Sequence, residues 1–166
     1  KQYITSYTAC YYGGSFENMN DTGVAVFEDN NLVANFKTMG GSLISTPIDI
    51  NEDGKDEFLS FSGYIHMGEV QGDFSINEID NNRLITLYTD VDYYDICFSS
   101  EDSKESFSKF YLTKGEMPKI RIEDFSRKIS PPTCKSEQPF KLIKERSVLI
   151  DVEKQRNTTD EAKFYK

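Results

Sequence analysis

The pattern of hydrophobic and polar positions between Thr22 and Phe125 is that of short β-strands. Segments rich in β-branched and aromatic residues are separated by Gly, Asn and Asp, as is typical of antiparallel strands. No stretch of this span repeats apolar residues every three to four positions, as an amphipathic helix does. The expected strands cover residues 24–27, 32–37, 57–62, 74–79, 84–89, 93–98, 106–112 and 119–125. The pattern predicts an all-β fold.

Two of the expected hairpins share the same turn. Residues 24–36 and 74–87 each contain a strand, an Asp-Asn-Asn turn and a return strand, and these turn residues tolerate left-handed backbone angles. Asp29 and Asp80 are 51 positions apart, a spacing in the range of repeated β units such as propeller blades. Antiparallel, propeller-blade-like sheets are therefore one expected arrangement, and two unrelated hairpins in a β-sandwich are the other.

The composition changes after residue 130. Pro131 and Pro132 lack backbone donors and cannot continue a central strand, so we expect residues 1–130 to form the β domain. Residues 131–166 are expected to supply a closing segment and a charged C-terminal tail. Within that segment, residues 140–152 fit a closing strand or a short helix, and the polar residues beyond Glu153 offer little to bury.

Length and charge narrow the classes of function. A chain of 166 residues suffices for one ordinary domain. Its formal net charge of −9 repels phosphate backbones, so we expect no nucleic-acid partner. No apolar run approaches the roughly 20 residues of a membrane-spanning helix, so no membrane span is expected. The acidic balance suits carboxylates that hold divalent cations, and it suits general solubility equally well.

One loop carries the spacing of a calcium site. Calcium prefers six to eight oxygen ligands, and a short loop supplies them when carboxylates and carbonyls alternate. Residues 49–57 place oxygen-bearing side chains at positions one, three, five and nine, and Gly54 at position six permits a sharp turn. The expected ligands of Ca²⁺ are the side chains of Asp49, Asn51, Asp53 and Glu57 and the backbone carbonyl of Lys55.

Segment 47–59, PIDINEDGKDEFL, resembles the calcium loop of FG-GAP or VCBS-type repeats, found in integrin α-chain propellers and many secreted bacterial proteins. An EF-hand is less favoured, because Ser60 stands where a bidentate Glu is required and Pro47 opposes a preceding helix. The chain has one such loop, whereas a closed propeller needs at least four blades. The resemblance implies one strand-loop-strand calcium site in a secreted domain, extracellular or periplasmic.

Three cysteines, Cys10, Cys97 and Cys134, are too widely spaced for a Cys-x-x-Cys redox pair or a clustered zinc site. The simplest oxidised arrangement is one disulfide with one cysteine left over, and Cys97 and Cys134 are the candidate pair. Three reduced, buried thiols are the alternative.

Tyr11 and Tyr12 are candidate ligand-binding residues. They stand beside two glycines outside the expected strands, and exposed aromatic rings offer flat surfaces to a sugar or to another protein. A glycan partner is therefore considered alongside a protein partner.

No recognisable catalytic motif is present, and we expect no enzyme activity. His66 is the only histidine and has no partner in a nucleophile motif. Asp90, Asp92 and Asp95 cluster without a turn glycine, which favours solvated carboxylates on a strand over a second cation site.

The sequence therefore favours a secreted, calcium-stabilised, non-enzymatic β domain that acts in adhesion, assembly or interaction with a protein partner. The metal is expected to hold the fold together, since a calcium sensor of the EF-hand type needs a bistable helix pair. A carbohydrate-binding module, or an accessory domain of a secreted enzyme, is the alternative.

Overall fold

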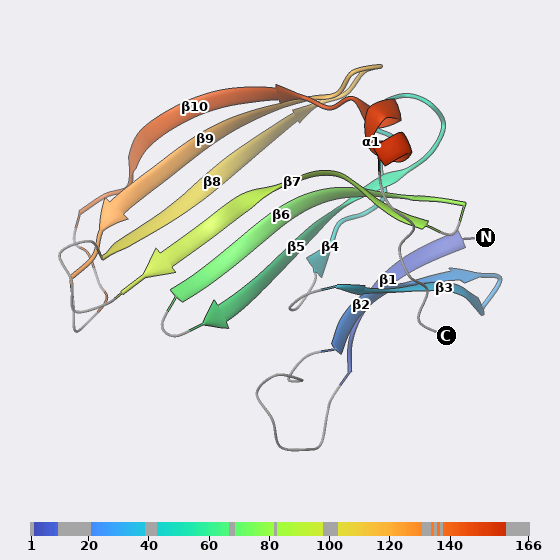
Figure 1. The fold of residues 1–166 in the computed structure, drawn as a ribbon, viewed down its shortest axis with the longest axis horizontal. Coiled ribbons are helices and arrows are strands. Elements are labelled where there is room, and N and C mark those ends of the chain that lie inside the picture. The colour runs from blue at the N-terminus through green and yellow to red at the C-terminus, as the bar shows by residue number, and fades with distance from the viewer. Residues whose placement is uncertain are drawn as a thin grey trace.

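The computed structural model describes residues 2–9, 21–38, 43–66, 69–81, 83–97, 103–130, 134, 136 and 138–158 (Figure 1). These residues are mostly β-strand, with one short helix near the C-terminal end. The elements are β1 (Gln2–Ala9), β2 (Asp21–Glu28), β3 (Asn31–Thr38), β4 (Leu43–Ile44), β5 (Glu57–His66), β6 (Glu69–Asp80), β7 (Arg83–Ile96), β8 (Lys104–Thr113), β9 (Lys119–Lys128), β10 (Lys141–Leu149) and α1 (Val152–Thr158).

The strands form two antiparallel sheets. The smaller has the order β1-β2-β3, and the larger has the order β10-β9-β8-β7-β6-β5-β4, so that consecutive strands are neighbours. The predicted all-β, antiparallel fold is therefore confirmed. The sheets have three and seven strands, and neither has the four strands of a typical propeller blade.

The larger sheet folds over its own core. Only the last four residues of β7, from Tyr93 to Ile96, pair with β8, and the two strands diverge toward α1 (Figure 1). The part of the sheet that contains β6 and the part that contains β8 face each other, and apolar side chains pack between them. Phe74 of β6 stacks on Phe110 of β8, with ring centroids 4.2 Å apart. The buried core residues are Ile50, Phe74, Ile76, Ile85, Leu87, Ile120, Ile122, Ile150 and Val152.

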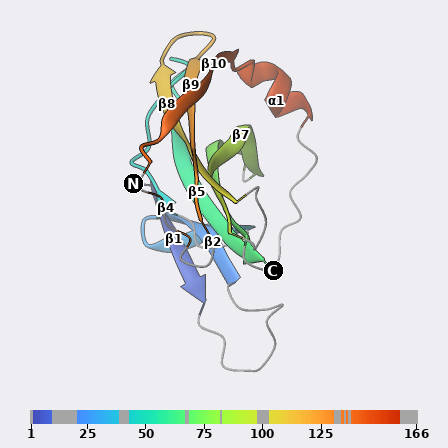
Figure 2. The same cartoon turned by 90° about the vertical axis from the view of Figure 1, so that its left-hand side faces the viewer.

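The smaller sheet has its own buried cluster, made by residues of β2 and β3. Val26 and Phe36 belong to it, and Ile79 and Leu84 from the β6-β7 hairpin of the larger sheet pack against it. Figure 2 shows this sheet and α1 at opposite ends of the view. The loop that precedes β5 borders both sheets, because Gly54 and Lys55 line one pocket with Val26 of β2 and Ile79 of β6.

Both predicted Asp-Asn-Asn hairpins form. Asp29 and Asn30 adopt positive φ angles of 46° and 69°, and Asn81 adopts 50°, as the turn residues predict. The two hairpins lie in different sheets, β2-β3 in the smaller and β6-β7 in the larger.

One strand prediction was wrong in its boundaries. The separate strands expected at 84–89 and 93–98 are one continuous strand, β7, which runs through residues 90–92. Asp is typical of turns, but here Asp92 is the extra residue at a register shift against β6 and Asp90 pairs regularly with Phe74. The pattern of apolar residues did not predict β1 or β4.

The C-terminal segment closes the larger sheet. Of the two possibilities for residues 140–152, a closing strand is the one that forms, as β10 beside β9. The helix α1 follows where a charged tail was expected, and Val152 anchors it in the core. Cys97 and Cys134 form a disulfide, so the alternative of three reduced thiols was wrong.

Candidate functional site

The loop 49–57 joins β4 to β5, as the predicted strand-to-strand turn requires. Ile48 and Glu57 close its base: the Ile48 amide donates to the Glu57 carbonyl at 2.8 Å, and the Glu57 amide donates back to Ile48 at 3.1 Å. No helix flanks the loop among the described residues on either side. The intervening residues are therefore held in a compact turn at the edge of the larger sheet.

Side-chain oxygens of the loop accept hydrogen bonds from its own backbone. The Gly54 amide donates to Asp49 at 3.0 Å, and the Lys55 amide donates to Asp53 at 2.9 Å. A longer bond of 3.4 Å joins the Asp53 amide to Asn51. Gly54 has a φ of 86°, a left-handed angle that a residue without a β-carbon adopts at little cost. These bonds curl the loop around its acidic side chains.

Two carboxylate oxygens of the loop are buried without a hydrogen-bond partner. They are Oδ1 of Asp49 and Oε1 of Glu57. Glu57 is 0% exposed, and its other oxygen accepts a hydrogen bond of 2.8 Å from the amide of Ile50, a core residue. Because a buried carboxylate oxygen without a hydrogen-bond partner is costly, these two oxygens would be stabilised by a positively charged ligand.

Glu57 faces a second buried carboxylate. Glu78 is its direct partner across the β5-β6 pair, and Glu78 is also 0% exposed. Like charges at opposed positions of neighbouring strands repel each other. Burial, followed by the charges of Glu78, Asp53 and Asp49, raises the pKa of Glu57 to about 7, although the hydrogen bond from the Ile50 amide acts to lower it.

Cations from two elements neutralise Glu78. Arg156 of α1 donates to Glu78 from Nη2 at 2.6 Å and from Nε at 3.0 Å. Lys55 lies 3.7 Å away from the same carboxylate and donates to Asp80 at 2.9 Å. Among the described residues, no Lys or Arg pairs with Glu57 in this way. Arg156 and Lys55 therefore compensate the negative charge of Glu78, whereas no Lys or Arg of the described residues compensates that of Glu57.

Arg156 also connects the loop to α1. Its Nη2 donates to Oδ2 of Asp53 at 2.6 Å, although the two residues are far apart in the chain. Burial acts to raise the pKa of Asp53, but the hydrogen bonds that it accepts from Arg156 and from the loop outweigh burial and lower it. Asp53 is thus a stable anion shared between the loop and the helix.

The donor set suits a hard cation in its chemistry. The five predicted ligands offer only oxygen atoms, which are the ligands that calcium prefers. Among the described residues, no group of three or more His, Cys, Asp and Glu is arranged to hold a metal. The predicted set includes an amide and a backbone carbonyl beside its carboxylates, and one carboxylate, Asp53, is directed toward Arg156. Of the five predicted ligands, Asp49 and Glu57 are the two that keep a buried carboxylate oxygen without a hydrogen-bond partner.

An acidic hollow of about 410 Å³ opens beside the loop. Its carboxylates come from the loop, from the β8-β9 connection and from the start of α1. They are Glu52, Asp53, Glu116, Asp151 and Glu153. A concave surface of one charge sign raises the local concentration of counter-ions, so this hollow favours the approach of cations to the loop.

The other predicted site residues do not meet here. Tyr11 and Tyr12 lie outside the described residues, as does the side chain of His66. Asp90 is ion-paired with Arg146 and does not share a site with Asp95.

Asp92 is half-buried rather than solvated. Its carboxylate occupies the space that a β-carbon at Gly72 would take, and one of its oxygens has no partner. Burial, and then the nearby charge of Asp73, raises the pKa of Asp92.

The sequence did not predict a polar network that connects β7, β8, β9 and β10. Arg146 of β10 donates to Asp124 at 3.1 Å and to Asp90, and Asp90 accepts a hydrogen bond from Tyr88. Ser108 donates to Asp124 at 2.7 Å. No local spacing signals this network, because its members come from four strands that only the fold brings together.

Comparison with known proteins gives no match. No family model, no curated protein and no solved structure matches the chain. Among the described residues, no helix is both long enough and apolar enough to cross a membrane. The resemblance of segment 47–59 to FG-GAP or VCBS-type calcium loops stays a prediction from the sequence.

Proposed function

We propose that this chain is a calcium-stabilised, secreted β domain that serves as a non-enzymatic adhesion, assembly or interaction module. The calcium ligands would be the side chains of Asp49, Asn51, Asp53 and Glu57 and the carbonyl of Lys55. The observation that carries the proposal is the fully buried carboxylate of Glu57, which faces Glu78 and keeps one oxygen without a partner.

A bound cation would neutralise the buried carboxylates of the loop more completely than a proton does. A proton neutralises only Glu57, and a pKa of about 7 means that it is held only partly near neutral pH. The unpartnered oxygen of Asp49 would still be buried. A divalent ion offers charge to both carboxylates at once, and calcium tolerates the mixed carboxylate, amide and carbonyl ligands that this loop presents.

The location of the loop favours a structural role for the metal. Ile50 lies within the loop and is fully buried in the main core, and Glu57 begins β5. Holding the loop closed therefore holds a core residue and a strand in place. Metal binding that requires the folded loop adds its free energy to folding.

The disulfide favours an oxidising compartment. Cys97, which directly follows β7, is bonded to Cys134 in the connection between β9 and β10. Such bonds persist mainly outside the cytosol. A secreted location, extracellular or periplasmic, suits both the bond and a calcium site, because metal and disulfide together stabilise one exported domain.

Thermal unfolding in calcium and in chelator tests this proposal. A ligand at about 100 times its Kd stabilises the folded state by about 2.7 kcal/mol, so we expect calcium to raise the Tm by about 5 to 10 °C. Magnesium should give a smaller shift, because it demands stricter octahedral geometry.

Two loop variants form a matched pair for this test. Glu57→Gln should abolish the calcium-dependent rise in Tm, whereas Asp56→Asn, an exposed neighbour outside the ligand set, should retain it. Equal Tm values for the unsubstituted protein in calcium and in chelator would refute the proposal.

A further inference from the structure

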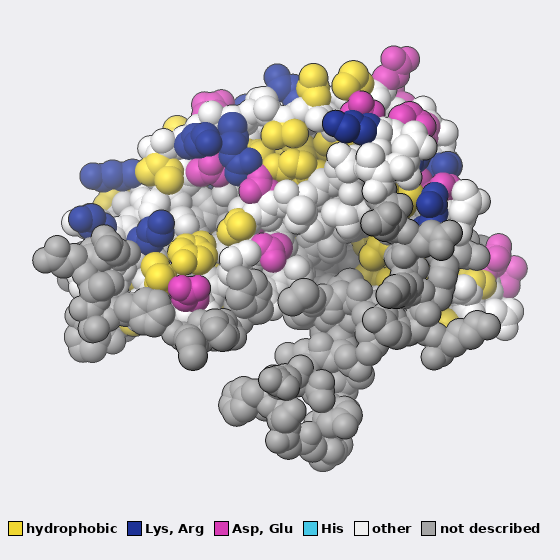
Figure 3. All heavy atoms as spheres, in the orientation of Figure 1, with side chains coloured by type: hydrophobic (Ala, Val, Ile, Leu, Met, Phe, Trp, Pro, Cys, Tyr) yellow, Lys and Arg dark blue, Asp and Glu magenta, His cyan; other side chains and the backbone are white. Residues whose placement is uncertain are grey.

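The outer edge of β10 is open. This strand pairs with β9 on one side and ends the order of the larger sheet, so within the described part of the chain no strand covers its other side. Its first five residues are all exposed, and among them Leu142 is 52% and Ile143 is 65% exposed. In Figure 3, hydrophobic side chains lie beside Lys and Arg side chains along the margin that Figure 1 assigns to β10.

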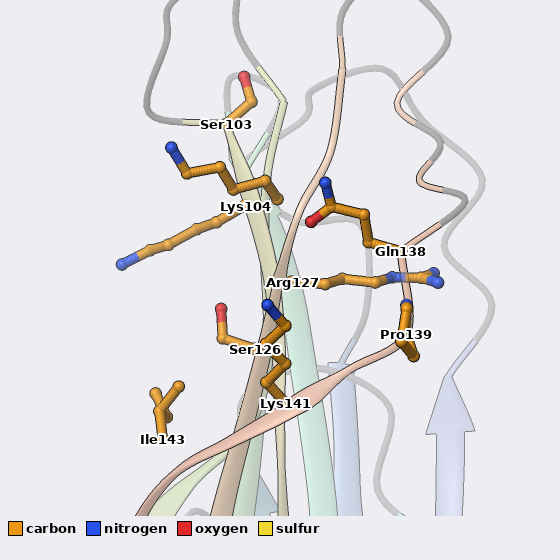
Figure 4. A pocket seen from close by; sticks show the side chains of 9 residues that line it. Ser103, Lys104, Ser126, Arg127, Gln138, Pro139, Lys141 and Ile143 are labelled. Atoms are coloured by element: carbon orange, nitrogen blue, oxygen red, sulfur yellow. The ribbon is translucent and has the colours of Figure 1, made fainter.

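A basic cavity of about 400 Å³ adjoins the start of this edge. Lys104, Lys128, Lys141 and Ile143 are among its lining residues. Figure 4 shows Lys104, Ser126 and Ile143 extending to one side of the strands, and Arg127 extending to the other. The cavity concentrates positive charge in a chain whose formal net charge is −9.

The lysines of the cavity are placed against each other. Lys104 and Lys128 are direct partners across the β8-β9 pair, and like charges at such positions destabilise a sheet. Within the described residues, neither Lys128 nor Lys141 forms an ion pair with a carboxylate. A negatively charged ligand in the cavity would relieve this repulsion.

One register for pairing this edge with a second copy of itself is unfavourable. A symmetric antiparallel pair centred on Glu145 would place the two glutamates together and Lys144 opposite Arg146. Those contacts join like charges, which opposes pairing. Lysines on an edge strand are a common protection against self-association. The same lysines do not oppose an acidic strand.

We propose that the open edge of β10 and the adjoining basic cavity bind an extended acidic peptide segment of a partner protein, which adds to the larger sheet as a further strand. Backbone hydrogen bonds along an exposed edge supply affinity in this mode of recognition, and side-chain contacts supply specificity. Acidic side chains would meet the three lysines, and apolar ones would cover Leu142 and Ile143. This surface does not involve the calcium loop.

Synthetic peptides as long as β10, nine residues, test the proposal. The probe alternates glutamate with valine, the first control replaces glutamate with lysine, and the second keeps glutamate but carries N-methyl groups on alternate amides. Calorimetric titration of the intact protein should show binding of the first peptide only. Hydrogen exchange should then slow at β10 amides.

Variants of the protein locate the site. Lys128→Glu combined with Lys141→Glu should weaken binding of the glutamate peptide by about tenfold. Lys119→Glu should not, because this exposed lysine lies at the other end of β9 and outside the cavity. Circular dichroism establishes that each variant is folded.

Three outcomes overturn the proposal. One is no binding of the glutamate peptide, and another is equal binding of its lysine counterpart. The third is undiminished binding of the N-methylated peptide, which would show that charge acts without strand pairing. A heparin oligosaccharide that binds at this surface when the peptide does not would assign it to anionic polysaccharides instead.

Discussion

In the absence of metal, protonation of Glu57 determines how the free energy of unfolding changes with pH. Burial, followed by the charges of three neighbouring carboxylates, raises its pKa from an ordinary value of 4.5 to about 7. Between these two values the folded protein keeps the proton that the unfolded chain releases. Stability in chelator is therefore highest in the acidic part of this range and falls as the pH rises through 7.

The size of this loss follows from the pKa. One pKa unit corresponds to about 1.4 kcal/mol, so ionisation of Glu57 in the folded state costs about 3 kcal/mol by pH 8. Glu57→Gln removes the charge while its side-chain oxygen still accepts from the Ile50 amide. In chelator, the variant should match the unsubstituted protein near pH 5 and exceed it by about 3 kcal/mol at pH 8.

Urea unfolding at pH 5, 6, 7 and 8 in chelator measures the free energies of unfolding of both proteins. Subtracting one from the other at each pH removes the contribution of the ionisable groups that they share. Asp56→Asn controls for the loss of one charge from the same loop and should track the unsubstituted protein. In calcium the order at pH 8 should reverse, because the metal stabilises only the intact site and binds more tightly as its ligands lose protons. Parallel pH curves for Glu57→Gln and the unsubstituted protein would refute this reasoning.

Three further predictions concern an ion pair beside the loop, the disulfide and the main core. Arg156→Met leaves the buried carboxylate of Glu78 with Lys55, 3.7 Å away, as its remaining cation and should lower the free energy of unfolding by about 3 kcal/mol. Adding Glu78→Gln should restore part of the loss, and no restoration would count against the pair. Replacing Cys97 and Cys134 by serine removes a bond that spans 37 positions and should cost about 3 to 4 kcal/mol in denaturant unfolding. Phe74→Ala should cost about 3 to 5 kcal/mol by the same measurement, because its ring packs between the two halves of the larger sheet; a loss below about 1 kcal/mol would place the core elsewhere.

The sequence predicted most strands because their signals are local. Alternating apolar residues mark the strand interiors, and the Asp-Asn-Asn turns place the chain reversals at Asp29 and near Asn81. The limit of local signals is seen in β7, where Asp90 and Asp92 resemble a turn but lie within a continuous strand. Asp90 is held there by Arg146, a residue of β10 that no local pattern connects to it.

The same limit applies to the candidate site. The spacing of residues 49–57 predicted a turn between strands, and that turn forms between β4 and β5. The opposition of Glu57 and Glu78 depends on strand register, which the loop sequence does not contain. Arg156 was assigned to a charged tail because residues beyond Glu153 offer little apolar surface. Its helix is held instead by Val152 in the core and by ion pairs with Asp53 and Glu78.

Asp53 is bonded both to the loop and to α1, so calcium binding at Asp53 would affect the contact between them. Its Oδ2 accepts from Arg156, while its Oδ1 accepts from the loop backbone. Coordination of a cation by Asp53 would compete with the bond to Arg156 but not with the stronger set of contacts between Arg156 and Glu78. The helix would therefore keep its main ion pair when the loop binds metal.

A crystal structure grown with calcium, with anomalous scattering recorded for the metal, tests the central claim most directly. We expect one ion enclosed by residues 49–57, with oxygens of Asp49, Asn51, Asp53, Lys55 and Glu57 at about 2.4 Å. An empty loop at saturating calcium, with the carboxylate of Glu57 still lacking any partner, would contradict it.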